Sequence, residues 1–131
     1  MEMKNLKAKD IMTSPVISTK KNVSSRDIAM QLVSGPFSGM PVTDDEGRVI
    51  GVITEYDLLN KVRKGKDLLQ ITVEDVMQKN PITVDVNTAL GDVLDIMIEN
   101  GILRIPITEG LRLVGVISRS DILRIALKQS V

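Results

Sequence analysis

The stretch GVITEYDLL at residues 51–59 returns almost unchanged as GVISRSDIL at residues 115–123. Each copy is an apolar run followed by a hydroxyl residue and, three residues further on, by an aspartate. A short apolar run is typical of a buried strand, and a hydroxyl residue in front of an amphipathic segment is typical of a helix N-cap. Each copy therefore predicts a strand that leads directly into a helix.

This pair belongs to a duplication that covers most of the chain. A shift of about 65 residues aligns the two halves block by block, as expected for an internal repeat. We therefore divide the chain into a first repeat at residues 1–65 and a second repeat at residues 66–131. The other aligned blocks are KDIMTSPVIS at 9–18 with EDVMQKNPITV at 74–84, RDIAMQLV at 26–33 with GDVLDIMI at 91–98, and MPVT at 40–43 with IPIT at 105–108.

The first repeat has the signals of a strand, a helix, a hairpin and a second helix, preceded by one helical turn at 9–12. An extended segment is expected near 16–19. A helix should begin after the N-cap Ser24 and end at Gly35. Apolar runs on both sides of a Gly-containing turn then predict a hairpin over 40–53. The amphipathic segment 55–63 is the second predicted helix.

The second repeat predicts the same elements in the same order, with a shorter hairpin turn. Its helical turn falls at 74–77 and its extended segment at 82–86. Thr88 is the expected N-cap of the long helix and Gly101 its end. The hairpin should occupy 105–117, and the last helix 119–128.

The fold class that follows is α+β (mixed α/β), with two β-α-β-β-α repeats. A unit of roughly 60 residues buries only about 60% of its unfolded surface and is marginal alone. The repeats have matching apolar faces, so we expect them to pack around a pseudo-twofold axis, with equivalent clefts on either side.

Composition excludes several classes of function. Seventeen basic residues balance seventeen acidic ones, which gives no electrostatic reason to expect nucleic acid or a membrane as partner. The chain has no Cys and no His, so thiol chemistry, a histidine general base and a usual zinc site are excluded. We expect neither an enzyme nor a metal site, and without a targeting segment a cytoplasmic location.

Taken together, these blocks resemble a tandem pair of cystathionine beta-synthase (CBS) motifs, the arrangement called a Bateman module. The resemblance covers almost the whole chain. It implies a mixed α/β module, commonly a homodimer, that binds adenosine-containing ligands and regulates another protein without catalysis. The blocks that carry it are DIMTSPV at 10–16 with DVM at 75–77 and NPITV at 80–84, FSGMPV at 37–42 with ILRIPI at 102–107, and GVITEYDLL with GVISRSDIL.

The residue types at the two strand-to-helix junctions suit a nucleotide without reference to the family. Free backbone N–H groups and the positive end of a helix dipole gather behind Thr54 and Ser118, which favours an anion. Asp57 and Asp121 lie in the first helical turn, where a carboxylate can accept both hydroxyl hydrogens of a ribose. The alternative is that each hydroxyl–aspartate pair is only a capping box that stabilises its helix.

The resemblance implies that each ligand site combines residues from both repeats. In one site the hydroxyl residue and aspartate of one repeat meet the first strand and hairpin of the other. Their aliphatic side chains would enclose an adenine, although each also suits an ordinary core. One site would join Thr54 and Asp57 to Pro81, Ile82, Leu103, Arg104, Ile105 and Pro106; the other would join Ser118 and Asp121 to Thr13, Pro15, Val16, Ser38, Gly39, Met40 and Pro41.

The two sites are not expected to be equal. Arg104 stands where the first repeat has Gly39, and its guanidinium would suit a phosphate in the Asp57 site. Many family members carry a basic residue directly before the aspartate, whereas this chain has Tyr56 and Ser120 there. That departure favours a monophosphate or an uncharged adenosyl compound over a multiply phosphorylated ligand.

The sequence therefore predicts a sensor module for AMP, ADP, ATP or S-adenosyl compounds, with no required cofactor and a regulated protein as further partner. Two alternatives stay open at this point. The first is a protein–protein interaction module with vestigial clefts, and the second a nucleic-acid-binding CBS protein, which zero net charge and only two aromatic residues make less favourable.

Overall fold

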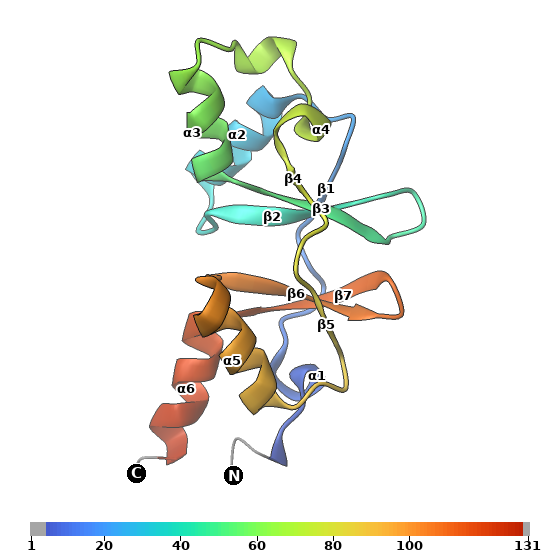
Figure 1. The fold of residues 1–131 in the computed structure, drawn as a ribbon, viewed down its shortest axis with the longest axis vertical. Coiled ribbons are helices and arrows are strands. Elements are labelled where there is room, and N and C mark those ends of the chain that lie inside the picture. The colour runs from blue at the N-terminus through green and yellow to red at the C-terminus, as the bar shows by residue number, and fades with distance from the viewer. Residues whose placement is uncertain (1–4, 130–131) are drawn as a thin grey trace. The chain divides into compact units, whose positions relative to one another are not determined.

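A computed structural model describes residues 5–129 and divides the chain into two compact units. Unit 2 is the continuous segment Ile17–Pro81, and unit 1 combines Met1–Val16 with Ile82–Val131. Each unit contains one sheet with its helices on one face (Figure 1). The predicted mixed α+β class is confirmed.

Unit 2 is built on a four-stranded sheet in the order β1-β2-β3-β4. β1 runs parallel to β2, and the other neighbours are antiparallel. The helices α2 and α3 contact each other on one face of this sheet (Figure 1). Its elements are β1 (Thr19–Lys20), α2 (Ser25–Ser34), β2 (Gly39–Thr43), β3 (Val49–Thr54), α3 (Glu55–Arg63), a 3-10 turn η2 (Leu68–Gln70), α4 (Val73–Val76) and β4 (Gln78–Lys79).

Unit 1 repeats this plan with a three-stranded sheet in the order β5-β6-β7. β5 is parallel to β6, and β6 and β7 form the antiparallel hairpin. Its helices α5 and α6 contact each other as α2 and α3 do. Its elements are α1 (Ala8–Ile11), β5 (Val84–Asp85), α5 (Leu90–Asn100), β6 (Arg104–Glu109), β7 (Arg112–Ser118) and α6 (Arg119–Gln129).

Each unit has its own hydrophobic core between sheet and helices. The cores use the alternate strand residues and the inner helix faces that the periodicity predicts. In unit 2 the fully buried side chains include Ile28, Val42 and Ile53. In unit 1, Val93 and Ile107 are buried to the same degree.

The compact units divide the chain at different places from the sequence repeats. The segment with α4 and β4 belongs to the second repeat by sequence, yet it packs in unit 2 along β3. The segment with α1 belongs to the first repeat by sequence, yet it packs in unit 1 along β7. There Thr13 and Val116 exchange two backbone hydrogen bonds of 2.9 and 3.1 Å. Each unit therefore borrows its edge segment from the opposite repeat, while the repeat limits 1–65 and 66–131 stay a prediction about the duplication.

The predicted helices and hairpins are present, and one predicted cap is wrong. Ser24 caps α2 by accepting a hydrogen bond from the backbone of Arg26 at 3.2 Å. The N-cap of α5 is Ala89 and not Thr88. The backbone N–H of Leu90 donates instead to the carbonyl of Leu6 at 2.8 Å, so the borrowed segment satisfies a helix end that the prediction assigned to a side chain.

Among the helices within residues 5–129, none is both long and apolar enough to cross a membrane.

Candidate functional site

In unit 2 the predicted pair Thr54 and Asp57 lies where β3 leads into α3. Oδ2 of Asp57 accepts hydrogen bonds from the backbone N–H of Thr54 at 3.0 Å and from its hydroxyl at 2.8 Å. The backbone N–H of Asp57 donates to Thr54 Oγ1 at 3.2 Å. The pair is thus a capping box, and the half-buried carboxylate is held in one orientation at the positive end of the helix.

The second oxygen of Asp57 has a partner that the sequence analysis missed. Gln78 Nε2 donates to Asp57 Oδ1 at 3.0 Å. Gln78 opens β4, the edge strand that unit 2 takes from the second repeat. The sequence offers one signal for Gln78, its position directly after Met77 in the block that aligns with Met12. Only the pairing of β3 with β4 shows that its side chain reaches Asp57.

In unit 1 the pair Ser118 and Asp121 repeats the arrangement where β7 leads into α6. The backbone N–H of Ser118 donates to Asp121 Oδ2 at 2.8 Å, and the N–H of Asp121 donates to Ser118 Oγ at 3.3 Å. The hydroxyls of Ser118 and Ser120 lie 2.9 Å apart. Here the second oxygen of the aspartate accepts from Arg124 Nη1 at 2.9 Å, so a cation takes the place that a neutral amide has in unit 2.

The hairpin register brings one further predicted residue beside each pair. Gly39 lies opposite Thr54, and Arg104 lies opposite Ser118. A Cβ at Gly39 would lie 2.8 Å from the carbonyl oxygen of Ile53, so the backbone there leaves no room for a side chain. The two junctions therefore differ by a whole arginine side chain at equivalent positions.

Arg104 is half-buried and lies in the field of Asp121. Burial lowers the pKa of the Arg104 guanidinium below its ordinary value, and the Asp121 carboxylate opposes that shift. The sequence analysis joined Arg104 to the Asp57 site. The structure shows it beside Ser118 and Asp121 in its own hairpin, and its combination with Asp57 stays a prediction.

The carbonyls that precede each hairpin are tied to the same junctions. The backbone N–H of Glu55 donates to the carbonyl of Ser38 at 2.8 Å, and that of Arg119 donates to Leu103 at 3.0 Å. Ser38 and Leu103 are thereby fixed beside Thr54 and Ser118, respectively.

The remaining predicted site residues are divided between the units. Met40, Pro41, Ile105 and Pro106 are buried in the two hairpins, and Met40 and Ile105 belong to the hydrophobic cores. The combinations across units, including Ile82 and Leu103–Pro106 with Asp57 and Ser38–Pro41 with Asp121, stay predictions. Pro81 belongs to unit 2, as Asp57 does. Unit 1, which contains Asp121, also contains Thr13, Pro15, Val16 and Ile82.

Within residues 5–129, no group of three or more acidic side chains is arranged to hold a metal ion. Each junction holds a fixed carboxylate and a hydroxyl at the N-terminal end of a helix. A fixed carboxylate suits a ligand that donates hydroxyl hydrogens, and the positive end of the helix dipole favours an anionic group.

The chain is similar to a known protein family, to curated proteins and to solved structures. A model of the CBS domain matches the chain twice, at residues 8–64 and 73–128. Among curated proteins, the L-aspartate semialdehyde sulfurtransferase of Methanocaldococcus jannaschii is 28% identical over 118 residues, which are 89% of this chain and 22% of that protein. The chain spans only 22% and 32% of the length of the first two curated relatives that it matches.

Two solved structures with bound ligands are similar over nearly their whole length. The CBS domain pair of protein MJ0100, in complex with 5'-methylthioadenosine and S-adenosyl-L-methionine, has a TM-score of 0.83 at 26% identity and covers 95% of this chain and 98% of that one. CBSX2, a protein of Arabidopsis thaliana, was solved in complex with AMP. It has a TM-score of 0.83 at 26% identity and covers 95% and 99% of the two chains.

Proposed function

Because this chain belongs to the CBS domain family and carries two copies of the domain, we propose that it is a regulatory module that binds adenosine-containing ligands without catalysis. The candidate ligands are AMP, ADP, ATP and S-adenosyl compounds. They act as regulatory ligands and not as cofactors of a reaction.

One observation carries the proposal: the duplicated capping box at a strand-to-helix junction. In each box one carboxylate oxygen is fixed by the helix end, and the other faces a side-chain donor, Gln78 for Asp57 and Arg124 for Asp121. Exchange of that donor for a ribose diol keeps the carboxylate hydrogen-bonded throughout. The helix N-terminus behind it favours a phosphate or carboxylate on the same ligand.

The similar structures support this ligand class. AMP, 5'-methylthioadenosine and S-adenosyl-L-methionine all carry an adenosine group, and each was found with a CBS pair similar to this chain. The ribose diol is common to all three, as expected if a fixed aspartate is the shared recognition element.

The absence of Cys and His supports a non-catalytic role, because a thiol nucleophile and histidine, the side chain most often used as general base, are missing. The relative named as a sulfurtransferase shares only 22% of its length with this chain. We propose that the module passes ligand occupancy on to a protein partner, either in another chain or in a larger protein.

Exposed apolar helix faces support a homodimer. In unit 2, Val33 on α2 is 84% exposed and Tyr56 on α3 is 70% exposed. In unit 1, Ile98 on α5 is 71% exposed and Leu123 on α6 is 61% exposed. An exposed apolar patch of several large side chains is typical of an interaction surface.

Calorimetric titration with AMP, ADP, ATP, S-adenosylmethionine and 5'-methylthioadenosine tests the ligand class. We expect saturable binding of at least one ligand and its loss in the double variant Asp57→Ala/Asp121→Ala. Asp75→Ala is the matched control, since Asp75 forms the same kind of capping box with Thr72 on α4, which is not one of the two candidate junctions.

The control should lose some stability through its cap and keep its ligand affinity. Absence of binding to the whole panel, or equal affinity in the double variant and the native protein, contradicts the proposal. Thermal unfolding of each variant verifies that lost binding does not reflect lost folding.

A further inference from the structure

The side chain of Gln78 joins two elements of unit 2 that come from different repeats. Gln78 opens β4, the edge strand of the four-stranded sheet, and Asp57 lies in the first turn of α3. Gln78 Nε2 lies 3.0 Å from Asp57 Oδ1 and 3.2 Å from Oδ2, so one amide group bridges both carboxylate oxygens. This contact attaches the edge strand to the helix at the candidate site.

The carboxylate of Asp57 has little acceptor capacity left for a ligand. An ionised carboxylate offers about four acceptor positions. Thr54 occupies two of them on Oδ2, through its backbone N–H and its hydroxyl. The bridging amide of Gln78 uses part of the remainder. A ribose diol donates two hydrogens, so it can bind this carboxylate through both of them only when Gln78 leaves.

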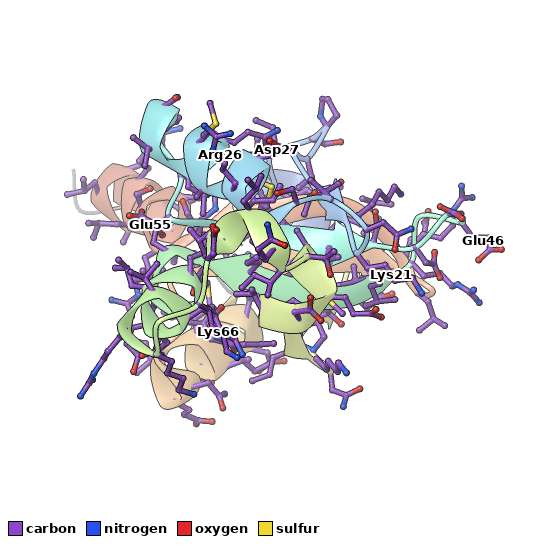
Figure 2. The ribbon with its side chains drawn as sticks, turned by 90° about the horizontal axis from the view of Figure 1, so that it is seen from above. Lys21, Arg26, Asp27, Glu46, Glu55 and Lys66 are labelled. Atoms are coloured by element: carbon purple, nitrogen blue, oxygen red, sulfur yellow. The ribbon has the colours of Figure 1, made fainter. Side chains whose placement is uncertain are left out.

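The contact lies where a ligand can reach it. Gln78 is exposed and Asp57 is half-buried. Glu55, the first residue of α3, is also exposed and lies at the outer surface of unit 2 (Figure 2). A hydrogen bond from an accessible neutral amide contributes little net free energy, because water can replace it. A ligand that supplies two donors can therefore displace Gln78 from Asp57.

The strand that Gln78 attaches is short. β4 has two residues, Gln78 and Lys79, and both pair with β3. Asn80 then adopts the left-handed conformation with a φ of 55°, and unit 2 ends at Pro81, which has no backbone N–H to donate. Because so short a strand has few ladder hydrogen bonds, one side-chain contact forms a considerable part of what holds it in place.

In unit 1 the equivalent contact stays within one helix. Thr13 stands where Gln78 stands in the duplication, and it pairs with β7 as Gln78 pairs with β3. Its side chain carries no amide, and Arg124 of α6 donates to Asp121 Oδ1 at 2.9 Å. Displacement of Arg124 therefore moves a side chain of the same helix, whereas displacement of Gln78 detaches a strand from a helix.

We propose that Gln78 is a positioning residue that competes with the ligand for the carboxylate of Asp57, so that ligand occupancy in unit 2 frees the edge strand β4 from α3. The inference rests on the proposed function and deepens it, since it assigns to one of the two junctions the means by which occupancy is passed on. By thermodynamic reciprocity, the factor by which Gln78 weakens ligand binding equals the factor by which the ligand weakens the attachment of β4.

Calorimetry with AMP and 5'-methylthioadenosine measures the competition, in an Asp121→Ala background that leaves Asp57 as the fixed carboxylate under test. Gln78→Ala should tighten binding of both ligands about fivefold, the factor expected for one neutral hydrogen bond. Gln78→Lys should weaken binding of 5'-methylthioadenosine, which has no phosphate, because an ammonium group holds the carboxylate more strongly than an amide does. Gln70→Ala, at an exposed glutamine of η2 in the same unit, is the matched control and should leave both affinities unchanged.

Hydrogen exchange measures the attachment of β4 independently of affinity. Saturating AMP or 5'-methylthioadenosine should speed backbone amide exchange in a peptide that covers residues 78–80 about fivefold, in line with the reciprocal coupling. In Gln78→Ala the same peptide should exchange at the faster rate without ligand and respond little to it. A role of Gln78 in folding alone would not make the exchange rate depend on the ligand.

The outcomes separate failure of this inference from failure of the proposed function. Weaker or unchanged binding in Gln78→Ala, or slower exchange of residues 78–80 on ligand addition, overturns the competition. Binding by the native protein that disappears in Asp121→Ala also overturns it, because Asp57 then holds no ligand, and leaves the proposed function standing. A native protein that binds neither probe overturns the inference, and the full ligand panel then decides the proposed function separately.

Discussion

The thioether of Met77 packs directly on the α-carbon of Gly51, where an added Cβ would lie 2.6 Å from the sulfur. The same Cβ would lie 2.9 Å from the carbonyl oxygen of Gln78. Met12 packs on Gly115 in the same way in unit 1. In each unit the Met–Gly contact therefore packs the edge segment from the opposite repeat against the strand, β3 or β7, that leads into the candidate site.

Gly51→Ala should destabilise the protein by about 1–3 kcal/mol, because overpacking forces neighbouring atoms to move. Gly115→Ala should cost a similar amount, since an added Cβ would lie 2.9 Å from the Cβ of Met12, an atom that moves only with the backbone. Urea denaturation measures both.

Gly91→Ala is the control for these variants. Gly91 lies in α5 with nothing within 4 Å of an added Cβ. Replacing a helical glycine with alanine should stabilise by about 0.5–1 kcal/mol. If Gly51→Ala and Gly91→Ala change the free energy of unfolding equally, the close contact between Met77 and Gly51 does not limit which side chain fits there.

Ser25 provides a second test of packing. Its side chain is fully buried in α2, and its hydroxyl has no hydrogen-bond partner among residues 5–129. Ser25→Ala should stabilise by about 1 kcal/mol, because it removes an unsatisfied polar group and improves helix propensity. Ser34→Ala, at the exposed end of the same helix, should change the free energy of unfolding by less. A loss of stability in Ser25→Ala would indicate that the hydroxyl has a partner, such as a buried water.

Local periodicity predicted the helices and hairpins because each depends on residues close in sequence. The hairpin register was also accessible: if Ile105 and Ile117 pair, Arg104 must lie opposite Ser118. The duplication could not show which copy of the Met segment packs on which strand, since both copies have the same pattern. Gln78 was missed because its contact with Asp57 depends on the pairing of β3 with β4. Arg124 lies three residues after Asp121 on one helix, a spacing that the sequence does show.

The capping box on α4 predicts an acid-sensitive contribution to stability. Hydrogen bonds from the backbone N–H and the hydroxyl of Thr72 hold the pKa of Asp75 below its ordinary value of 3.8. A depressed native pKa adds stability above the unfolded pKa, and this stability is lost as the pH falls through the native value. Asp75→Asn should therefore lose stability at neutral pH and show a shallower decline below about pH 4.

Urea midpoints across the acid range measure this effect. Thr72→Val removes the hydroxyl donor and keeps the backbone N–H, so its acid decline should lie between those of the native protein and Asp75→Asn. If the native protein and Asp75→Asn decline with the same slope, the hydrogen bonds to Asp75 do not stabilise the folded state.

Arg104 should make the junction of unit 1 selective for anionic ligands. Its half-buried guanidinium lies opposite Ser118, at a position where unit 2 has only the hydrogen atom of Gly39. A charge-assisted hydrogen bond to a phosphate is worth more than a neutral one. Arg104→Gln should then lower AMP affinity about tenfold and leave 5'-methylthioadenosine, which has no phosphate, nearly unchanged.

Calorimetry with both ligands measures this ratio, and Arg112→Gln at the exposed far end of the same hairpin is the control. The control should leave both affinities unchanged, because Arg112 begins β7 and the candidate junction ends it. Equal losses for AMP and 5'-methylthioadenosine in Arg104→Gln would assign Arg104 a structural role in the hairpin. A selective loss of AMP would show that the duplicated junctions have diverged in the charge of the ligand they accept.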